Sequence, residues 1–359
     1  MILVTGGAGY IGSHAVQRLL RDGQSVVVLD NLHRGHASAI ELLKHEVAKG
    51  KPSPTLALVE GEIGDYDLVL DVLKEYGVRE AMHFAALAYV GESVTRPLVY
   101  YRNNTASALS LLEACDAAAV ERIVFSSTCA TYGEPSADQI PIPESCVQRP
   151  INPYGWSKLH TERMLLDYSA QRRNAGRPVG LAILRYFNVA GSDRVGVLGE
   201  HHHPETHLVP VVLQSLLGTR GNFGGPAGEE GRALTVFGTD YPTPDGTCIR
   251  DYVHVEDLVD AHLAVLRALR PGEDRIYNLG IGRGYSVREI IASCERVTGL
   301  RVNVKEGPRR PGDPPALYAD PTKIHREIGW RASITDLDEI VRSAWEWFRK
   351  HPAGYQTGL

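Results

Sequence analysis

Residues 2–12 read ILVTGGAGYIG, a short apolar run followed at once by a glycine-rich turn. The turn contains a GxGxxG pattern at Gly7, Gly9 and Gly12, and Gly6 extends it. Glycines in this pattern allow a tight turn and let backbone N–H groups approach a pyrophosphate, whose charge a helix N-terminus favours. Because strand, turn and helix follow in the order that the motif requires, the stretch predicts a dinucleotide-binding unit. A purely structural glycine-rich turn is the alternative.

An acid ends the next apolar run, SVVVLD at residues 25–30, and lies 18 residues after Gly12. A carboxylate at the end of this strand accepts hydrogen bonds from ribose hydroxyls and repels a 2′-phosphate. Asp30 therefore favours NAD over NADP as the cofactor, although Arg34 lies close by and could favour a phosphate.

Apolar runs alternate with helical segments through the first half of the chain. The expected strands are residues 1–5, 25–30, 56–59, 81–84 and 122–126, and the expected helices are 13–22, 67–76, 105–119 and 154–170. This alternation is typical of a parallel sheet covered on both faces. We predict an α/β protein with a doubly wound parallel sheet of the Rossmann type and a smaller, mostly C-terminal α/β domain.

A length of 359 residues suits two domains rather than one. We place the dinucleotide-binding domain at residues 1–180, with later segments at about 235–280 rejoining it, and an interleaved second lobe at residues 181–359. The glycine-rich stretch at 221–231 is expected to be a surface loop.

The composition excludes several classes of protein. Hydrophobic residues make up 43% and charged residues 23%, as in soluble globular proteins, and the net charge of −5 argues against nucleic acid as a partner. No apolar stretch approaches the roughly 18 residues of a membrane helix, and the N-terminus does not read as a secretory signal. Five widely spaced cysteines fit reduced thiols in the cytoplasm.

Tyr154 and Lys158 occur in the sequence YGWSK at a spacing that places both side chains on one face of a helix. A nearby ammonium lowers the pKa of a phenol, so the pair could move a proton on and off a substrate hydroxyl. Ser126, Ser127 and Thr128 close an apolar strand, and their hydroxyls are expected to face the ligand crevice. A solvated helix face is the alternative for the tyrosine–lysine pair.

Longer segments show that the chain resembles the extended short-chain dehydrogenase/reductase family, and within it the UDP-sugar 4-epimerases. They are TGGAGYIGSH, VLDNL, HFAA, VGESV, YYRNN, FSSTCATYGEP, NPYGWSK, LRYFNVAG, GTDYPTPDGTCIRDYVHV, YNLGIG and PRRPGD. The resemblance implies NAD-dependent epimerisation at C4 of a UDP-sugar, with UDP-glucose and UDP-galactose as first candidates, through a transient 4-keto sugar. It also implies a homodimer that packs through the helix of Tyr154 and the helix at 105–119.

The resemblance implies roles for individual residues. The catalytic residues would be Thr128, Tyr154 and Lys158. The NAD contacts would be Gly6, Gly7, Gly9, Tyr10, Ile11, Gly12, Asp30, Asn31, Glu62, Ile63, Phe84, Ala85, Ala86, Asn103, Ser126 and Phe187. The UDP-sugar contacts would be Asn188, His207, Leu208, Phe237, Arg250, Arg310, Asp313 and Leu317.

Five positions depart from the family pattern. Thr128 replaces the more familiar serine but keeps the hydroxyl, and Glu62 stands where an aspartate is usual. Ala88 replaces a lysine of some members, so one charge contact to the cofactor is expected to be absent, and His207 replaces an asparagine. Leu317 is smaller than the tyrosine of some members, which leaves N-acetylated sugars open.

Other functions remain open at this point. UDP-N-acetylhexosamines or UDP-xylose and UDP-arabinose are alternative substrates. A nucleotide-sugar 4,6-dehydratase would need an added acid and base after Thr128, where Cys129 and Ala130 stand. A net dehydrogenase and a non-catalytic NAD-binding protein are further alternatives. The histidines at 201–203 and His207 invite a metal site, but we expect none and interpret this segment as an exposed polar loop.

Overall fold

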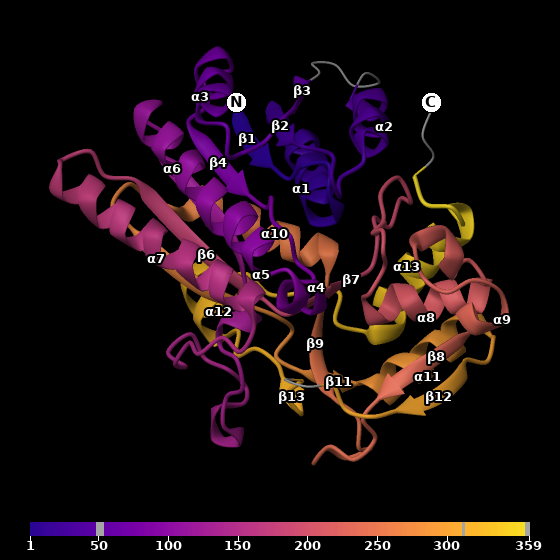
Figure 1. Cartoon of the computed structure of the whole chain (residues 1–359). Helices are drawn as coiled ribbons and strands as arrows, with labels where there is room; N and C mark the ends of the chain where they lie inside the picture. Colours follow the sequence, from indigo (N-terminus) through magenta and orange to yellow (C-terminus); the bar gives the residue numbers. More distant parts are fainter. Residues whose placement is uncertain (48–53, 311–312, 356–359) are drawn as a thin grey trace.

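A computed structural model describes residues 1–47, 54–310 and 313–355 of the chain (Figure 1). Of the PRRPGD segment, Pro311 and Gly312 lie outside the described residues. The centre of the fold is a seven-stranded parallel sheet with the order β10-β6-β5-β4-β1-β2-β3. Its strands are β1 (Ile2–Thr5), β2 (Val26–Asp30), β3 (Leu56–Glu60), β4 (Glu80–His83), β5 (Arg122–Thr128), β6 (Gly180–Tyr186) and β10 (Asp274–Leu279). The predicted α/β fold class is confirmed.

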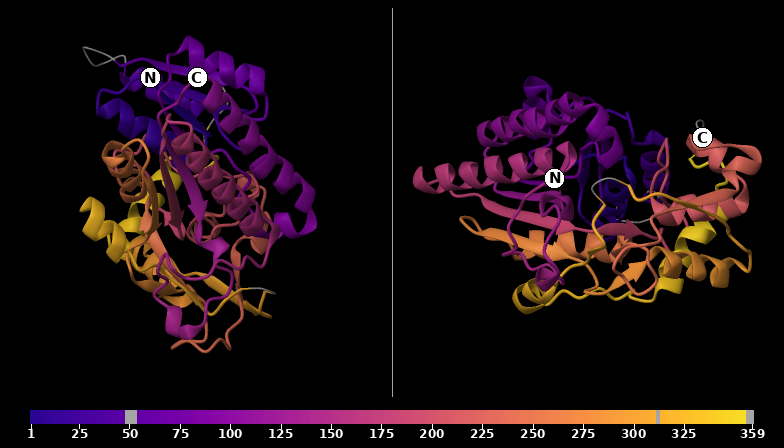
Figure 2. Two further views of the ribbon diagram at one scale, coloured as in Figure 1. Left: turned by 90° about the vertical axis from the view of Figure 1, so that its left-hand side faces the viewer. Right: turned by 60° about the horizontal axis from the view of Figure 1, so that its bottom comes forward.

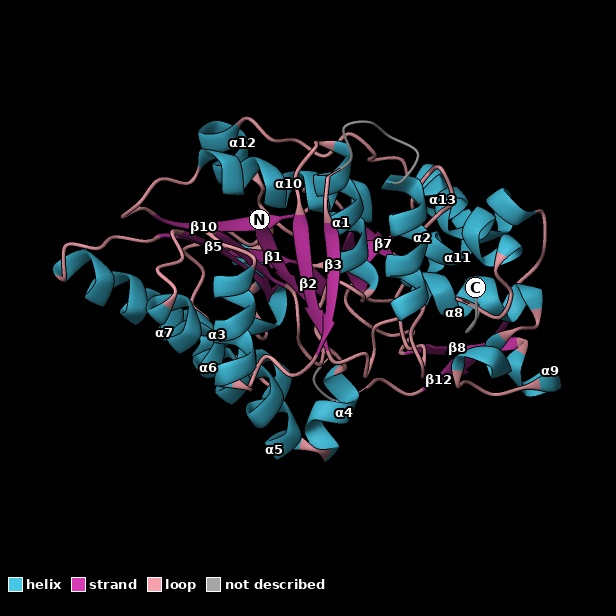
Figure 3. Cartoon of the chain, turned by 90° about the horizontal axis from the view of Figure 1, so that it is seen from above, coloured by secondary structure: helices cyan, strands magenta, loops and turns pink. Residues whose placement is uncertain are grey.

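Helices cover both faces of this sheet (Figure 3). One face carries α1 (Tyr10–Arg21), α2 (Ala37–Val47), α10 (Val255–Ala268) and α12 (Thr322–Ile328). The other carries α3 (Tyr66–Glu75), α6 (Ser107–Ala117) and α7 (Pro153–Asn174). Because side chains alternate along a strand, Val26 and Val28 of β2 join the core under α1, whereas Val27 and Leu29 join the core under α3 and α6.

All four expected helices have different boundaries in the structure, by one residue for α3 and by up to four residues for α7. Helix α1 begins at Tyr10, directly after Gly9, three residues earlier than the polar pattern predicts. The segment expected as one helix at 105–119 is preceded by α4 (Val90–Thr95), α5 (Pro97–Tyr100) and a π-helical turn at Tyr101–Ala106, and α6 itself starts at Ser107. The π-turn places the polar YYRNN segment beside α7.

A second lobe packs against the carboxyl side of the sheet (Figure 2). It holds a four-stranded sheet of β7 (Asn188–Ala190), β9 (Ile249–His254), β11 (Gly284–Ser286) and β13 (Ala316–Leu317), and a two-stranded sheet of β8 (Ala233–Phe237) and β12 (Asn303–Gly307). Its helices are α8 (Leu208–Leu217), α9 (Gly228–Gly231), α11 (Val287–Thr298) and α13 (Leu337–Lys350), and short 3₁₀ turns lie at 129–131, 137–139 and 220–223.

The chain crosses between the lobes more than once. Within the range 235–280, helix α10 and strand β10 pack on the main sheet, whereas β8 and β9 belong to the smaller sheets. The expected surface loop at 221–231 is wrong in part. Phe223 is fully buried, with its ring 5.6 Å from that of Phe348. The glycines there predict a solvent-exposed loop, but the buried Phe223 ring packs this segment against Phe348 of α13.

All five cysteines are free thiols in the structure. Among the described residues, no helix is long and apolar enough to cross a membrane.

Candidate active site

The glycine-rich turn is packed so tightly that three of its four glycines have no room for a side chain. A Cβ on Gly12 would lie 2.1 Å from the Gly6 carbonyl oxygen, and a Cβ on Gly6, which has φ +69°, would lie 2.6 Å from the backbone nitrogen of Ala85. A Cβ on Gly7 would lie 2.8 Å from Val28 of β2. These contacts seat the N-terminus of α1 on the carboxyl ends of β1 and β4.

Gly9 differs from the other three, because only the Gly6 carbonyl oxygen, at 3.3 Å, lies within 4 Å of its Cβ position. The space beside Gly9 is therefore open at the start of helix α1. An open backbone at a helix N-terminus fits a pyrophosphate group. The turn thus fits the dinucleotide that the sequence pattern predicts. Tyr10 is buried, and its hydroxyl donates to the Gly191 carbonyl at 2.6 Å.

The acid of the second strand lies beside this turn. The Asp30 carboxylate accepts from the backbone N–H groups of Ala8 at 3.0 Å and Leu32 at 2.9 Å, and its burial raises its pKa. Asn31 donates to Glu62 at 3.0 Å. The ends of β2 and β3 therefore bring together the residues expected around the adenosine, and Ile63 is buried next to them.

The segment after β4 forms the next wall of the crevice. Phe84 packs near His262, with 5.0 Å between the ring centres, and Ala85 and Ala86 follow it. Asn103 donates to the side chain of Asn104 at 2.9 Å. Asn104 bonds both backbone groups of Leu87, so these residues form one hydrogen-bonded unit.

Three side chains meet at the carboxyl end of β5. Thr128 is the last residue of β5, and Tyr154 and Lys158 lie on the first turns of α7. Helix α7 starts here because Asn152 caps it by accepting from Gly155 N at 2.8 Å, and Pro153 occupies its first turn. The Thr128 side chain lies close enough to the Tyr154 hydroxyl for their interaction to lower the pKa of the phenol.

The electrostatics of the pair differ from the prediction. Burial raises the pKa of Tyr154 to about 12, and the contact that opposes this rise is the one with Thr128, not Lys158. The Lys158 ammonium instead donates to the Ser126 carbonyl at 2.8 Å and lies 4.8 Å from the centre of the Phe125 ring. Burial lowers the pKa of Lys158 to about 7, although the Glu162 carboxylate opposes this effect.

The three hydroxyls that end β5 do not all face the crevice, because alternate side chains of a strand point to opposite faces. Ser126 bonds to His262 Nε2 at 2.9 Å, and Ser127 donates to Glu162 in the core. The expectation for Ser127 is therefore wrong, and Thr128 alone reaches Tyr154.

A buried ion pair that sequence reasoning missed holds α7 on the sheet. Arg185 of β6 binds Glu162 of α7 through two nitrogens, at 3.0 and 2.6 Å, and their side chains are 4% and 1% exposed. Gln148 donates to the same carboxylate at 2.9 Å. One signal was available, since a charged arginine interrupts the apolar strand GLAILRY.

The residues expected at the UDP-sugar meet in the second lobe. Arg250 of β9 forms an ion pair with Asp313, and Leu317 of β13 is buried beside it as its partner in the sheet register. The Arg310 guanidinium stacks over the Phe237 ring at 4.1 Å. Arg250, Asp313 and Leu317 therefore form one group, and Arg310 with Phe237 forms a second.

The remaining expected substrate residues lie on segments that join the lobes. Asn188 begins β7, and Phe187 is buried just before it. Leu208 begins α8, and His207 is its N-cap residue.

The expectation of an exposed polar loop at 200–207 is wrong in part, because His203, Pro204 and Thr206 are exposed but the two acids are buried. Glu200 is 3% exposed and Glu205 is 5% exposed. The His201 ring stacks on His36, with 4.0 Å between ring centres, and accepts from Tyr355 N at 3.0 Å. Packing against the start of the chain and its C-terminal part buries the acids of this segment, which a polarity pattern cannot reveal.

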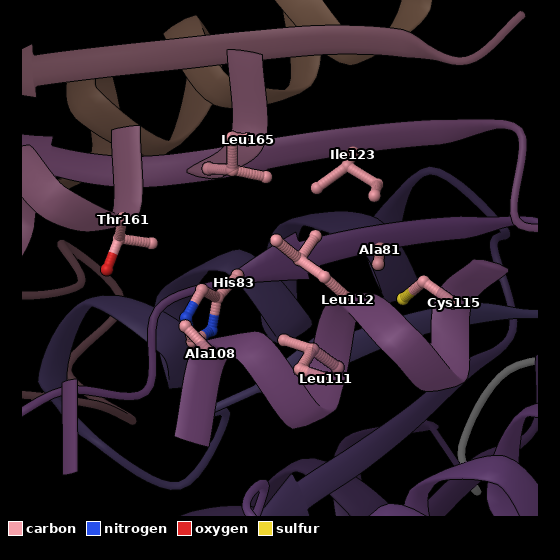
Figure 4. Close-up of a pocket in the computed structure, with 9 residues that line it drawn as sticks. All are labelled: Ala81, His83, Ala108, Leu111, Leu112, Cys115, Ile123, Thr161 and Leu165. Carbon is pink, nitrogen blue, oxygen red and sulfur yellow. The ribbon is translucent and has the colours of Figure 1, made fainter. Parts of the chain in front are cut away.

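A small apolar cavity of about 10 Å³ lies between the sheet and helices α6 and α7 (Figure 4). Its wall includes Ala81 and His83 of β4, and His83 bonds to Thr5 at 2.7 Å. The cavity is about the size of one water molecule, so it is an internal packing void and not a ligand site.

A doubly wound sheet, a glycine-rich turn with open space beside Gly9 at the start of α1, and a buried tyrosine–lysine pair are typical of a dinucleotide-dependent enzyme of the short-chain type. The sequence pattern of the NAD dependent epimerase/dehydratase family matches residues 2–280, and the chain belongs to this family. The pattern of GDP-mannose 4,6 dehydratase matches residues 238–344.

Individual relatives cover almost the whole chain. A UDP-glucose 4-epimerase of Azospirillum brasilense is 47% identical, over 97% of this chain and 92% of that protein. A probable UDP-arabinose 4-epimerase of Oryza sativa subsp. japonica is 45% identical, over 99% of this chain and 83% of that protein. The crystal structure of UDP-glucose 4-epimerase from Brucella ovis in complex with NAD is 44% identical, covers 97% of this chain and 98% of its own, and has a TM-score of 0.84.

Proposed function

We propose that this protein is an NAD-dependent UDP-sugar 4-epimerase, an isomerase, whose first substrates are UDP-glucose and UDP-galactose. The observation that carries the proposal is the buried Thr128–Tyr154 hydroxyl pair at the carboxyl end of β5, with Lys158 one turn further on. Relatives that are 4-epimerases and the NAD-bound neighbour support it.

In this function, Tyr154 takes the proton of the sugar 4-hydroxyl and later returns it. Thr128 donates a hydrogen bond to the reacting oxygen. NAD⁺ bound in the crevice supplies the site that accepts the C4 hydride and gives it back. Lys158 has three N–H donors and spends one on the Ser126 carbonyl, so it retains others for ligand hydroxyls.

The pKa of Tyr154 decides when its phenol can exchange a proton with the sugar. Burial raises the pKa of Tyr154 to about 12, so the phenol would have to lose its own proton before it could take that of the sugar, and the positive charge of bound NAD⁺ would favour this loss. The sugar must turn over between the two hydride transfers, so most of the binding falls to the UDP. Arg250 and Arg310 suit the diphosphate because a guanidinium matches phosphate oxygens.

The proposal is tested by denaturing the purified protein, measuring the NAD released, and offering UDP-galactose, UDP-N-acetylgalactosamine and UDP-arabinose in turn. We expect bound NAD and interconversion of UDP-galactose and UDP-glucose. Failure to interconvert any of the three sugars would refute the proposal.

A substitution then tests the base. Tyr154→Phe should reduce turnover by at least about 10³-fold while NAD content stays within twofold of the wild type. Tyr168→Phe is the matched control, because Tyr168 lies on the same helix and its hydroxyl has no hydrogen-bond partner. Equal activity of Tyr154→Phe and the control would show that Tyr154 is not the base.

UDP-arabinose is a second candidate substrate, because a probable UDP-arabinose 4-epimerase is 45% identical over nearly the whole chain. The residue at the sugar pocket is Leu317, whose size also leaves UDP-N-acetylhexosamines open. The ratio of kcat/KM values for the three sugars decides among them.

A 4,6-dehydratase is the alternative that the match at residues 238–344 favours. That match covers only the second lobe and the last main-sheet elements. Cys129 and Ala130, which follow Thr128, carry no carboxylate for the elimination of water. A product with a 4-keto-6-deoxy sugar would overturn the epimerase assignment in favour of this one.

We also propose a homodimer that packs through α6 and α7 and acts in the cytoplasm. Leu109 on α6 is 47% exposed and Trp156 on α7 is 40% exposed, and both are large apolar side chains. Leu109→Glu should convert a dimer to a monomer in light scattering. Leu300→Glu, at a position 43% exposed after α11, is the control and should not. A wild-type monomer would contradict the proposal.

A further inference from the structure

Four side chains of the segment at 200–207 converge on one point. They are Glu200, His202, Glu205 and His207, and one ligand atom of each lies within 4.8 Å of the others. Among the residues that the structure describes, this is the one group of three or more histidine, cysteine or acidic side chains that meets this criterion. The proposed epimerase chemistry makes no use of Glu200, His202 or Glu205.

We propose that these four side chains bind one divalent cation of the zinc class, which ties the segment at 200–207 to the start of α8. Two imidazoles and two carboxylates are ligands that Zn²⁺ accepts in a four-coordinate site. Mg²⁺ and Ca²⁺ prefer sites made of oxygen alone, so the two histidines argue against them.

The distances among the ligand atoms agree with a tetrahedral site. His202 Nδ1 lies 3.2 Å from Glu200 Oε1 and 3.4 Å from Glu205 Oε2. His207 Nδ1 lies 3.1 Å from Glu200 Oε1 and 2.9 Å from Glu205 Oε1. With metal–ligand bonds of about 2.0–2.1 Å, neighbouring ligand atoms of a tetrahedron are about 3.3 Å apart. The four measured distances lie close to this value, and the other pairs of ligand atoms lie within 4.8 Å, so the side chains would close in on the ion.

The carboxylate of Glu205 is held in place with one oxygen left over. Its Oε1 accepts from the backbone N–H groups of Thr206 and His207, both at 2.8 Å. Its Oε2 is buried and lies 3.4 Å from the Nδ1 atom of His202, and within the described part of the chain neither atom has a hydrogen-bond partner. A buried carboxylate oxygen without a donor is costly unless a cation neutralises it. Backbone donors that orient a ligand are typical of metal sites.

A network of two protonated histidines is the competing explanation, because it supplies the same two positive charges as one dication. The neighbouring carboxylates do raise the pKa of His202, to about 9 against the effect of burial, and that of His207. In such a network, however, each N–H should point at an oxygen. His207 Nδ1 meets this requirement, because it bonds Glu205 Oε1 at 2.9 Å. His202 Nδ1 lies 3.2 and 3.4 Å from two carboxylate oxygens, but among the described residues neither contact has the alignment of a hydrogen bond.

The four side chains lie between residues of the two lobes, so a cation bound there would link the lobes. The His202 ring is 6.1 Å from the Tyr10 ring of the glycine-rich turn and 6.1 Å from the Tyr89 ring. His207 is the N-cap residue of α8 in the second lobe. Coordination through Nδ1 leaves Nε2 of His207 free for another partner. The cation thus has a structural role, and it takes no part in hydride transfer.

The test uses Zn²⁺ and Co²⁺ as probes on the full chain. Protein purified with a chelator and dialysed should take up one Zn²⁺ per chain in a calorimetric titration. It should also develop the intense visible absorption of tetrahedral Co²⁺ when that ion is added. His202→Gln and Glu205→Gln should each weaken Zn²⁺ binding by at least about 10- to 100-fold. His203→Gln is the matched control, because His203 is exposed and its side chain is outside the cluster.

Two results would overturn the proposal. One is wild-type protein that binds neither ion at stoichiometric concentration, which would leave the protonated network as the explanation. The other is a failure of the variants to differ: either His202→Gln binds Zn²⁺ as tightly as the wild type, or the control His203→Gln loses as much Zn²⁺ binding as His202→Gln. The Co²⁺ spectrum of the wild type needs no variant, so poor folding of a variant does not prevent a decision. None of these readouts measures sugar turnover, so they are independent of the epimerase assay.

Discussion

Alanine substitutions at Gly12 and Gly9 should have different effects on stability, although both glycines belong to one motif. A Cβ on Gly12 would lie 2.1 Å from a backbone oxygen, about 1.3 Å closer than the 3.4 Å of an ordinary contact. A backbone atom cannot rotate away as a side chain can. Overpacking of this kind costs typically 1–3 kcal/mol, and we expect about 3 kcal/mol for Gly12→Ala. At about 2 °C per kcal/mol, this value lowers the Tm by about 6 °C.

Gly9 has φ −79° and ψ 176°, an extended conformation that alanine adopts without strain. Its Cβ would meet one atom, at 3.3 Å. Gly9→Ala should therefore leave stability unchanged, or raise it by about 0.4–1 kcal/mol by restricting the unfolded chain. The added methyl group would instead occupy the space beside the helix N-terminus where the pyrophosphate is expected. We predict that Gly9→Ala loses most of its NAD while remaining folded.

Two measurements separate these effects. Thermal unfolding after removal of NAD reports on the fold alone, since bound ligand would itself raise the Tm. Released NAD per chain, measured after denaturation, reports on the cofactor site. If Gly9→Ala unfolds as early as Gly12→Ala, or retains its full NAD content, the assignment of the two glycines is wrong.

Two further predictions concern the buried charges around α7. Burial lowers the pKa of Lys158 from 10.5 to about 7, so between these pH values the unfolded chain binds more protons than the folded protein. The free energy of unfolding should therefore rise with pH across this window, by up to about 5 kcal/mol relative to Lys158→Met. If urea unfolding gives the same free-energy difference between the wild type and Lys158→Met at pH 7 and at pH 10, this prediction is wrong. Arg185→Met leaves Glu162 buried without its partner and should cost about 3–5 kcal/mol, whereas adding Glu162→Gln should recover part of that loss. If the midpoint shifts in urea of Arg185→Met and Glu162→Gln add up to the shift of the double variant, the two side chains are not coupled.

Much of the fold could be predicted because its signals are local. The alternation of residues 25–30, the helical spacing of Tyr154 and Lys158 and the glycines at 6–12 all depend on near neighbours in the chain. The boundary of α1 was placed three residues late, because the start of the helix is set by the turn packing on β4 and not by polarity.

The sequence by itself determined the parallel sheet, the dinucleotide turn and the identity of the tyrosine–lysine pair, since each is written in consecutive residues. Only the tertiary structure decided which groups meet: Thr128 with Tyr154, Arg185 with Glu162, and Lys158 with the Ser126 carbonyl instead of the phenol. It also turned a polar segment at 200–207 into a buried cluster. The physical reason is that burial and contact depend on chain segments brought together from far apart. Burial and contact between such segments set the pKa values and decide whether a carboxylate oxygen finds a donor. The spacing of residues along the chain does not predict these properties.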